Sequence, residues 1–329
     1  MVTFQEMVKA RNLGVRWLLS KLNPDGSIGP VDQGLYYYRT PFALSTAGYG
    51  MEACALLDWI RENMFTKEGD FDGKYGRGGY GENFYTYPNA NLVIASQKLN
   101  QYDLAYRGVD FLCRMRDKEA GGFYNFKDKP RERQRLDIWT SSQAGLACLA
   151  VGRMKEAEET GIFLARMMDL QPDPEKKLYN VYQPGKGLLT SYPEEEAKYF
   201  VVDAESTMQY YFIPGIAAAF LGRLYMASGN EKHLELAEKY LEFSLRCSED
   251  QFTRPQVGKV GWGAAVLYRI TGASTYLNLA RKVAQYLVDY QHPQGYWQNI
   301  PPFTGLHHTI EVTSEFILHL ESILTSIHV

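Results

Sequence analysis

Hydrophobic residues recur along most of this chain at a spacing near 3.6 residues, whereas alternation with a period of two is hard to find. The longer period is typical of amphipathic helices and the shorter one of half-buried strands. The pattern predicts eleven helices, over residues 4–21, 42–64, 88–99, 102–117, 138–152, 155–169, 203–228, 232–247, 256–271, 275–291 and 308–327. Gly and Pro residues punctuate the breaks between them. The sequence therefore predicts an all-α protein.

These helices follow a recurring two-helix unit. The first helix of a unit is rich in small residues and ends at a glycine, such as Gly229 or Gly272. The second carries an alanine and an aromatic-Leu pair, as in residues 236–241 and 279–287, and a Gly-aromatic loop often follows. Repetition at this scale indicates stacked helical hairpins, because no single hairpin can bury its own apolar face.

The two helices of a unit differ in polarity. Small-residue helices, such as residues 138–151, suit close packing inside the protein, whereas helices 155–169, 232–247 and 275–291 carry Glu and Lys on one face and belong outside. About five or six such pairs can close into an α/α toroid around a central cavity, a single domain over residues 1–329. A linear solenoid is the alternative, but the terminal helices lack the polar outer face of an open stack.

One copy of the unit ends in a motif that resembles the repeats of a known protein family. The segment 280–297 ends Gln-His-Pro-Gln-Gly-Tyr-Trp and resembles the Q-x3-G-x-W ending of squalene and hopene cyclase repeats, and residues 17–27 look like a degenerate copy. The chain is thus similar to the α/α-toroid superfamily of class II terpene cyclases and prenyltransferase β subunits. Sugar-acting α/α barrels, namely N-acylglucosamine 2-epimerases and unsaturated glucuronyl hydrolases, share the "LYR-TG" helix ending. The resemblance implies a fold and not a chemistry.

The sequence departs from the catalytic motifs of those cyclases and transferases. The DxDD motif of class II cyclases is missing, and the nearest acids are Asp70 with Asp72 and Asp203 with Glu205. The Asp, Cys and His ligands that hold zinc in prenyltransferase β subunits have no matching pattern either. Alkene protonation of the squalene type and zinc-dependent prenyl transfer are therefore disfavoured, and we expect no metal and no cofactor.

Composition and charge exclude other classes. With 329 residues, 45% hydrophobic content and a net charge of -3, the chain can bury a large core and is unlike a disordered one. It has no basic patch that would capture nucleic acid. The N-terminus lacks the apolar core of a signal peptide, and the longest apolar run, residues 212–221, is too short to span a bilayer. We expect a cytoplasmic protein without a membrane segment. The sequence does not decide whether the protein forms a homo-oligomer.

Acidic and imidazole groups near the predicted starts of inner helices are the catalytic candidates. His308 and Glu311 lie three residues apart on one helix face, where the carboxylate can orient the imidazole for proton transfer, unless His308 only caps the helix. Asp203 with Glu205, and Asp137, offer carboxylates for acid-base chemistry, although each aspartate is equally a helix N-cap. In a closed ring, these acids would point towards one axis.

Aromatic residues make up 14% of the chain and supply most candidates for substrate binding. Their ring faces can stabilise a cationic transition state, shape an apolar substrate or stack on a sugar, or they can simply pack. The candidates are Tyr36, Tyr37, Tyr38, Arg39, Tyr85, Tyr87, Asn89, Trp139, Tyr210, Tyr211, Trp262 and His307. The glycine-rich loop 69–81 and the long connection 171–199 are predicted to cover the cavity mouth.

Three functions fit these observations. The first is an enzyme that cyclises or rearranges a hydrophobic, polyunsaturated or terpenoid-like molecule by holding its reactive conformer, with help from an acid or hydrogen-bond donor, or by a cofactor-free pericyclic closure. The second is a carbohydrate-active epimerase, lyase or unsaturated-uronide hydrolase. The third is a non-catalytic scaffold. Apolar cavity walls with few polar groups would favour the first, and many convergent polar groups the second.

Overall fold

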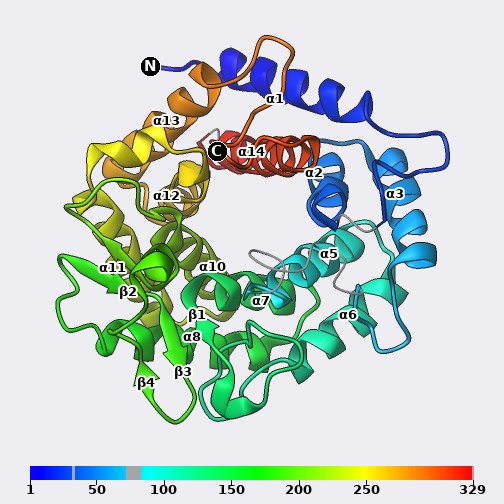
Figure 1. Ribbon diagram of the computed structural model, residues 1–329. Coiled ribbons are helices and arrows are strands. Elements are labelled where there is room, and N and C mark those ends of the chain that lie inside the picture. The colour runs from blue at the N-terminus through cyan, green and yellow to red at the C-terminus, as the bar shows by residue number, and fades with distance from the viewer. Residues whose placement is uncertain (32–33, 72–82, 328–329) are drawn as a thin grey trace.

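Two concentric rings of helices form the protein. The computed structural model describes residues 1–31, 34–71 and 83–327, and Figure 1 shows both rings in face view. The inner ring contains α2 (Thr40–Thr46), α5 (Thr86–Lys98), α7 (Ile138–Ala150), α10 (Phe212–Ser228), α12 (Gly258–Thr271) and α14 (Leu306–Ile327). The outer ring contains α1 (Phe4–Leu19), α3 (Gly50–Asn63), α6 (Tyr102–Arg114), α8 (Met154–Asp169), α11 (Glu231–Arg246) and α13 (Ser274–Asp289).

The ring is closed by the two ends of the chain. Each inner helix packs against the next, and α14 packs against both α2 and the N-terminal helix α1. Arg11 of α1 forms an ion pair with Glu321 of α14, which ties the first helix to the last. The six pairs of helices in the described part of the chain confirm the predicted closed α/α toroid, and the linear solenoid is wrong.

Burial follows the predicted division between the two rings. The inner helix α7 is buried from Ile138 to Cys148, around its whole circumference. The outer helix α8 buries only one stripe, which includes Ala157, Phe163 and Leu164. Small side chains let the inner helices approach from both sides, whereas the outer helices keep Glu and Lys in water.

Glycines have two recurring roles: they end inner helices, and they let loops pack closely against outer helices. Gly229 and Gly272 end α10 and α12 in the left-handed conformation, with φ of 70° and 69°, which costs glycine little. Gly26, Gly121 and Gly295 also have positive φ, and a Cβ on any of them would collide with a backbone carbonyl oxygen of an outer helix. The Gly-aromatic loops are therefore packing devices between neighbouring units.

The Q-x3-G-x-W segment has the same structural role. Gln291 donates hydrogen bonds to the carbonyl oxygens of Ala10 and Gly295, at 2.8 and 2.7 Å. Trp297 is fully buried and donates to the carbonyl oxygen of Leu287 at 2.7 Å. These contacts hold the loop before α14 against α1 and α13. The motif therefore has a structural role in packing the helices of the toroid.

Two predicted helix boundaries are wrong. The single helix expected over residues 42–64 is the inner α2 and the outer α3, because the chain turns at residues 47–49, where Gly48 has φ of 92°. The helix expected from residue 203 begins only at Phe212. Asp203 instead ends a strand, and Met208 has a left-handed φ of 59° in the turn that follows.

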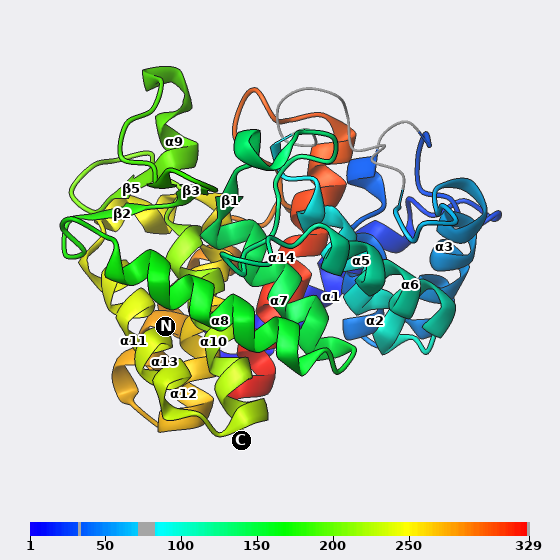
Figure 2. The ribbon, with the colours of Figure 1, turned by 90° about the horizontal axis from the view of Figure 1, so that it is seen from below.

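The two ends of the ring differ in their connections (Figure 2). Short turns lead from each inner helix to the next outer one, as at residues 99–101, 151–153 and 229–230. Long connections return at the other end. They hold β1 (Leu136–Asp137), β2 (Lys177–Tyr179), β3 (Val181–Gln183), β4 (Gly187–Leu188), β5 (Val201–Asp203) and the short helix α9 (Ala197–Phe200). The strands pair antiparallel in the orders β1-β3-β4 and β2-β5.

Candidate functional site in the central cavity

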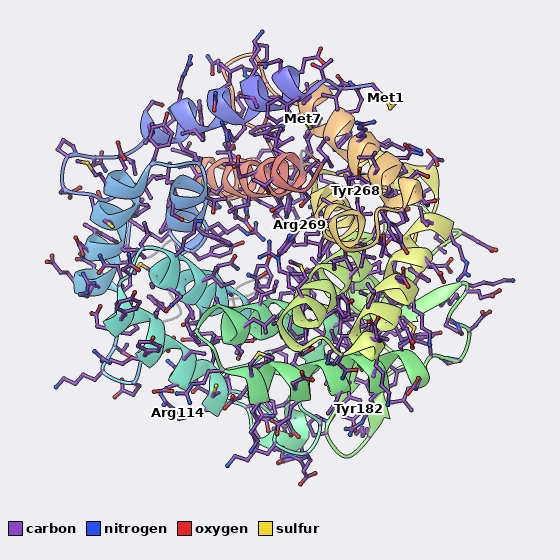
Figure 3. All side chains as sticks on the ribbon, turned by 180° about the vertical axis from the view of Figure 1, so that it is seen from behind. Met1, Met7, Arg114, Tyr182, Tyr268 and Arg269 are labelled. Carbon is purple, nitrogen blue, oxygen red and sulfur yellow. The ribbon has the colours of Figure 1, made fainter. Side chains whose placement is uncertain are left out.

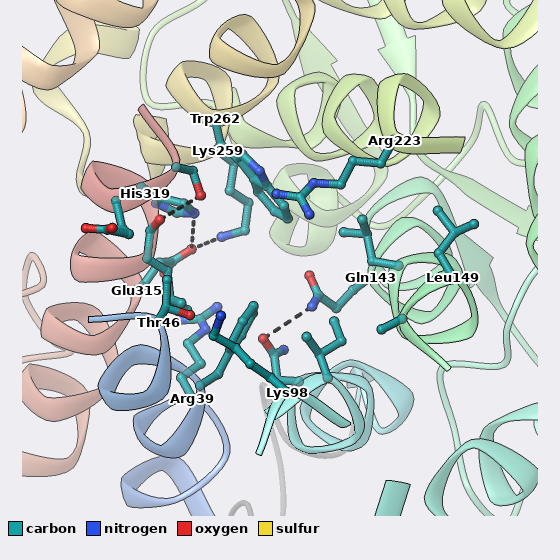
Figure 4. Close-up of a pocket in the computed structure, with 18 of the residues that line it drawn as sticks. Arg39, Thr46, Lys98, Gln143, Leu149, Arg223, Lys259, Trp262, Glu315 and His319 are labelled. Atoms are coloured by element: carbon teal, nitrogen blue, oxygen red, sulfur yellow. Dashed lines mark hydrogen bonds and ion pairs between the residues drawn. The ribbon is translucent and has the colours of Figure 1, made fainter. Parts of the chain in front are cut away.

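A cavity of about 710 Å³ lies inside the ring and receives side chains from all six inner helices (Figure 4). Its apolar lining consists of Phe42, Ile94, Leu146, Leu149, Ala150, Met154, Met226, Ala227, Trp262 and Leu318. Its polar lining consists of Arg39, Thr46, Tyr87, Asn91, Lys98, Gln143, Arg223, Lys259, Glu315, His319, Glu321, Ser322 and Thr325. Because Lys98, Ala150 and Ala227 lie at the C-terminal ends of their helices or just beside them, the mouth is at the short-turn end.

A buried network of charges lies at the inner end of the cavity. Arg39, at the N-cap of α2, contacts Glu311 at 3.0 Å and Glu315 at 2.7 Å. Lys259 of α12 forms an ion pair with the other oxygen of Glu315. The hydroxyl of Tyr38 donates to Glu311, and Arg39 donates to the hydroxyl of Tyr87 at 2.9 Å. We call these side chains, together with His319, the charged network.

The charges of the network balance within it. Burial acts to raise the pKa of Glu315, but the cations Arg39 and Lys259 outweigh it and hold this pKa at about 2, so the carboxylate is ionised. Burial lowers the pKa of His319 to about 3, so its imidazole is neutral at pH 7. Against the opposing effect of burial, the hydrogen bond from His308 and the charge of Arg39 lower the pKa of Glu311. Two cations and two anions leave no net charge, as a buried network requires.

This arrangement presents fixed dipoles to a ligand in the cavity. Arg39, Lys259 and Tyr87 line its inner end with N–H and O–H groups that are already oriented by their partners. Gln143 donates to Asn91 at 3.2 Å on the adjoining wall. Preorganised donors stabilise negative charge that develops on a reacting oxygen, since they need no reorientation during the reaction.

An aromatic layer lies beyond the network, towards the long connections. We define it as Phe84, Trp139, Tyr199, Tyr210 and Phe212. Trp139 lies 4.4 Å from Phe84 and 4.7 Å from Phe212, and Tyr210 lies 5.6 Å from Tyr199, between ring centroids. The rings pack on one another in tilted and edge-on geometry, which favours aromatic pairs. The layer therefore packs the space between the starts of α5, α7 and α10.

Asp137 lies beside the aromatic layer and is the N-cap of α7. It accepts hydrogen bonds from the backbone and hydroxyl of Thr140 and from Asn125. Burial outweighs these bonds and raises the pKa of Asp137 to about 6. Together with Arg135 and Tyr199, Asp137 lines a cavity of about 60 Å³. The capping role predicted for this residue is present, and its carboxyl can also carry a proton near neutral pH.

Several of the predicted site residues meet at the charged network. Arg39, Tyr87 and Trp262 line the central cavity, and Tyr38 and Glu311 belong to the network behind it. His308 lies 3.5 Å from Glu311, as their spacing predicted. His307 packs edge-on against Tyr36, with ring centroids 6.0 Å apart.

Other predicted residues serve packing at a distance from the cavity. Tyr37 stacks on Trp59 of the outer helix α3, with ring centroids 4.5 Å apart. Tyr85 donates to Asp70 at 2.5 Å and lies edge-on to Phe111 of α6. Both tyrosines therefore face the outer ring rather than the axis.

The remaining candidates hold loops. Asn89 accepts a hydrogen bond from the backbone of Phe71 at 3.0 Å, and Tyr211 donates to the carbonyl oxygen of Ser206 at 2.7 Å. Asp203 contacts Lys177 at 3.4 Å at the protein surface, and Glu205 is exposed. The predicted convergence of Asp203 and Glu205 on the axis is wrong, because the residues do not begin an inner helix.

Part of the network carries no role predicted from sequence. Lys259 is given none although it lies just before Trp262, His319 and Arg223 are not predicted at all, and the pattern alone does not decide whether Glu315 faces inward or pairs with a cation. The signal lies in α14, where Glu311, Glu315 and His319 follow at intervals of four within an apolar helix. Such spacing puts three titratable groups on one face.

Two further expectations concern loops and metals. The predicted lid 69–81 is described only at residues 69–71, and the rest lies outside the described residues. Within the described ranges, no group of three or more His, Cys, Asp or Glu side chains is placed to hold a metal ion. No helix in this part of the chain is long and apolar enough to cross a membrane.

Comparison with known proteins gives matches in structure alone. No family model and no curated protein sequence matches the chain. A D-mannose isomerase structure matches with a TM-score of 0.69 at 12% identity, over 97% of each chain. A GH76 α-mannanase of Bacteroides thetaiotaomicron matches at 0.64 and 11%, over 98% of this chain and 96% of that one.

A type II terpene cyclase, MstE from Scytonema, has the same fold. Its complex with the substrate geranylgeranyl dihydroxybenzoate matches with a TM-score of 0.60 at 13% identity, over 98% of this chain and 99% of that one. At these identities the likeness concerns the fold, since one fold hosts many chemistries. The chain thus has the α/α-toroid fold that terpene cyclases share with sugar-acting enzymes.

Proposed function

We propose that the protein is an enzyme that cyclises or rearranges a small, largely apolar molecule in the central cavity. The observation that carries this proposal is the layout of the cavity. Apolar side chains such as Leu149, Met226 and Leu318 form its outer wall, and the charged network with Arg39 and Lys259 lies at its inner end.

The size and walls of the cavity suit such a substrate. A volume of about 710 Å³ lies within the range of small-molecule sites, which are mostly apolar with a few placed polar groups. Walls of this kind hold a flexible chain in one reactive conformer, and the binding free energy then offsets the entropy lost before the reaction.

The charged network supplies the chemistry. Arg39 and Lys259, each held by Glu315, stabilise negative charge that develops on a carbonyl or hydroxyl oxygen of the substrate. Tyr87 accepts a hydrogen bond from Arg39, which strengthens its own hydroxyl as a donor. Carbonyl activation thus fits this site better than alkene protonation, because Glu315 is ionised and has no proton to give.

A carbohydrate-active function is the second candidate, and a specific observation favours it. Polar side chains converge on the cavity from several inner helices, among them Asn91, Gln143 and His319. Such groups pair with the hydroxyls of a sugar, and Trp262 offers a ring face on which a sugar can stack. D-mannose isomerase and the GH76 α-mannanase also have this fold.

The test is turnover of two matched panels. Purified protein is incubated with geranylgeranyl dihydroxybenzoate and simpler prenylated acids, or with D-mannose, α-1,6-mannotriose and uronic-acid oligosaccharides. Products are separated by chromatography and identified by mass spectrometry. We expect a product isomeric with a prenylated substrate, and its formation should fall at least tenfold in Arg39→Met, because the inner end of the cavity loses its principal donor.

The control variant is Arg246→Gln, which removes the same charge from the exposed face of the outer helix α11. It should leave turnover within twofold. Isomerisation or hydrolysis of a sugar by the wild type, with no conversion of any prenylated acid, would replace the first candidate by the second. If Arg246→Gln and Arg39→Met lost turnover equally, the role of the network would be wrong.

A further inference from the structure

Cationic side chains gather at the mouth of the central cavity without acidic partners. Lys98 ends α5 and Arg223 lies in the last third of α10, and both line the cavity (Figure 4). Arg269 lies near the end of α12, at the same end of the ring (Figure 3). Among the described residues, no carboxylate forms an ion pair with any of these three cations.

The cavity therefore carries a positive charge that it does not neutralise itself. Of the acids that line it, Glu315 is paired with Arg39 and Lys259, and Glu321 with Arg11. The chain as a whole has a net charge of -3, so this positive charge is local. A concave site lined by one sign of charge concentrates ligands of the opposite sign.

Arg223 packs on the cavity wall, although its side chain is exposed at the mouth. Its guanidinium lies 5.6 Å from the centroid of the Trp262 ring, within the cavity wall. Desolvation and the neighbouring charge of Arg269 both lower the pKa of Arg223. The two positive charges thus repel each other at the mouth, and a bound anion would offset that repulsion.

We propose that this mouth is an anion-binding site, in which Arg223 binds the carboxylate of a small organic acid whose apolar body lies along the cavity. The inference rests on the proposed function and deepens it by naming the substrate class. A guanidinium matches a carboxylate with two parallel hydrogen bonds, and Arg269 and Lys98 add attraction without such a fixed geometry.

The anionic head then lies at the mouth, and the reacting part of the substrate at the charged network. Trp262 lies between the two, since its ring centroid is 5.6 Å from the Arg223 guanidinium and 6.0 Å from the ring of His319. Trp262 and Leu146, which also lines the cavity, contact the apolar body. Arg223 is therefore a positioning residue: it holds the head at the mouth while the other end reaches Arg39 and Tyr87. Binding at a remote head can be used to fix the reactive conformer.

The test compares cis-parinaric acid, a polyunsaturated carboxylic acid that fluoresces when it is buried, with its neutral methyl ester. Binding is measured by titration with the wild type, Arg223→Gln, Arg223→Lys and the control Arg246→Gln. We expect the acid to bind the wild type at least tenfold more tightly than the ester. Arg223→Gln should abolish that preference, and Arg223→Lys should keep part of it.

The ester should bind all four proteins within twofold, which shows that the variants are folded and that the cavity is intact. Raising the salt concentration should weaken binding of the acid but not of the ester. Equal binding of acid and ester to the wild type would overturn the anion site and leave the proposed function standing. Binding of neither probe would overturn both the organic-acid ligand and the proposed function.

Inorganic phosphate is the second probe, because a free anion offers the same charge without an apolar body. We expect phosphate at tenfold the concentration of the acid to displace little of it. If phosphate bound in an Arg223-dependent way while parinaric acid did not bind, the mouth would be a site for an inorganic anion, and the inference of an organic acid would be wrong.

Discussion

The two ends of the ring are closed in different ways. At the long-connection end, the chain returns over the ring, and the aromatic layer fills the space around Trp139 and Phe212. At the short-turn end, short turns join the inner helices to the outer ones, and a cavity of about 710 Å³ remains. The charged network separates the two regions.

This difference shows that aromatic content alone does not mark a binding site. Most predicted aromatic residues lie at the long-connection end, where they pack on one another or hold loops. The central cavity has fewer rings, among them Tyr87 and Trp262, and more charged and amide groups. Packing and binding thus use the same residue types at opposite ends of the inner helices.

The largest expected effect concerns the network between the two ends. Glu315→Ala leaves Lys259 without its acid and Arg39 with Glu311 alone. Removing one partner of a buried pair costs about 3–5 kcal/mol of unfolding free energy, measurable by urea denaturation. Glu205→Ala, which removes an exposed acid, is the control and should change stability by less than about 0.5 kcal/mol. A loss below about 1 kcal/mol in Glu315→Ala would show that the network does not hold the ring together.

The next effect concerns Asp137 at the long-connection end. Its pKa is about 6 in the folded protein, above the 3.8 of an unperturbed aspartate, so the folded state holds the proton more tightly between these values. The free energy of unfolding therefore falls as pH rises from about 4 to 6, by about 3 kcal/mol in total for this group. Asp137→Asn keeps a capping oxygen but does not titrate.

The measurement is urea unfolding of the wild type and Asp137→Asn at several pH values from about 3.5 to 7. The stability of the wild type relative to the variant should decrease by about 3 kcal/mol across this range. A difference that stays constant with pH would mean that Asp137 ionises as it does in water, and that it is no candidate for an acid near neutral pH.

A smaller effect on stability is expected for Tyr37, which lies away from the cavity. Its hydroxyl bonds with Gly29, and its ring stacks on Trp59 of the outer ring. Tyr37→Phe should lower the unfolding free energy by about 1 kcal/mol, the typical net contribution of one hydrogen bond, and should leave parinaric acid binding unchanged. A change in the binding constant above threefold would place Tyr37 back among the substrate contacts.

The smallest effect concerns Asp203. Its contact with Lys177 is an ion pair at the surface, which contributes about 0–1 kcal/mol. Asp203→Ala should thus change the unfolding free energy by less than about 1 kcal/mol and leave turnover intact, since the residue does not reach the axis. Loss of turnover with normal stability would revive its predicted catalytic role.

The fold was predictable because it depends on a repeated pattern. Helix periodicity and the glycines that end helices recur in each unit. The Q-x3-G-x-W segment marks where one unit packs on the next. Errors at single helix boundaries therefore do not change the predicted ring. Missing the turn at residues 47–49 merged α2 with α3 but still left a closed toroid.

The site was harder to predict because it depends on which face each residue presents. Tyr37 and Tyr38 are adjacent in sequence, yet one packs on the outer ring and the other donates to Glu311. The helical pattern predicts Asp203 at the start of an inner helix, but that helix starts only at Phe212. Glu315 and His319 were within reach of the same spacing argument that found Glu311, but Arg223 has no local signal, because only ring closure brings it to the cavity.

The most direct test is the crystal structure of the protein with bound cis-parinaric acid. We expect the ligand in the central cavity, with its carboxylate within hydrogen-bonding distance of Arg223 and its chain directed towards Arg39 and Tyr87. A ligand at the opposite end of the ring, against Asp137 and Trp139, would contradict this expectation.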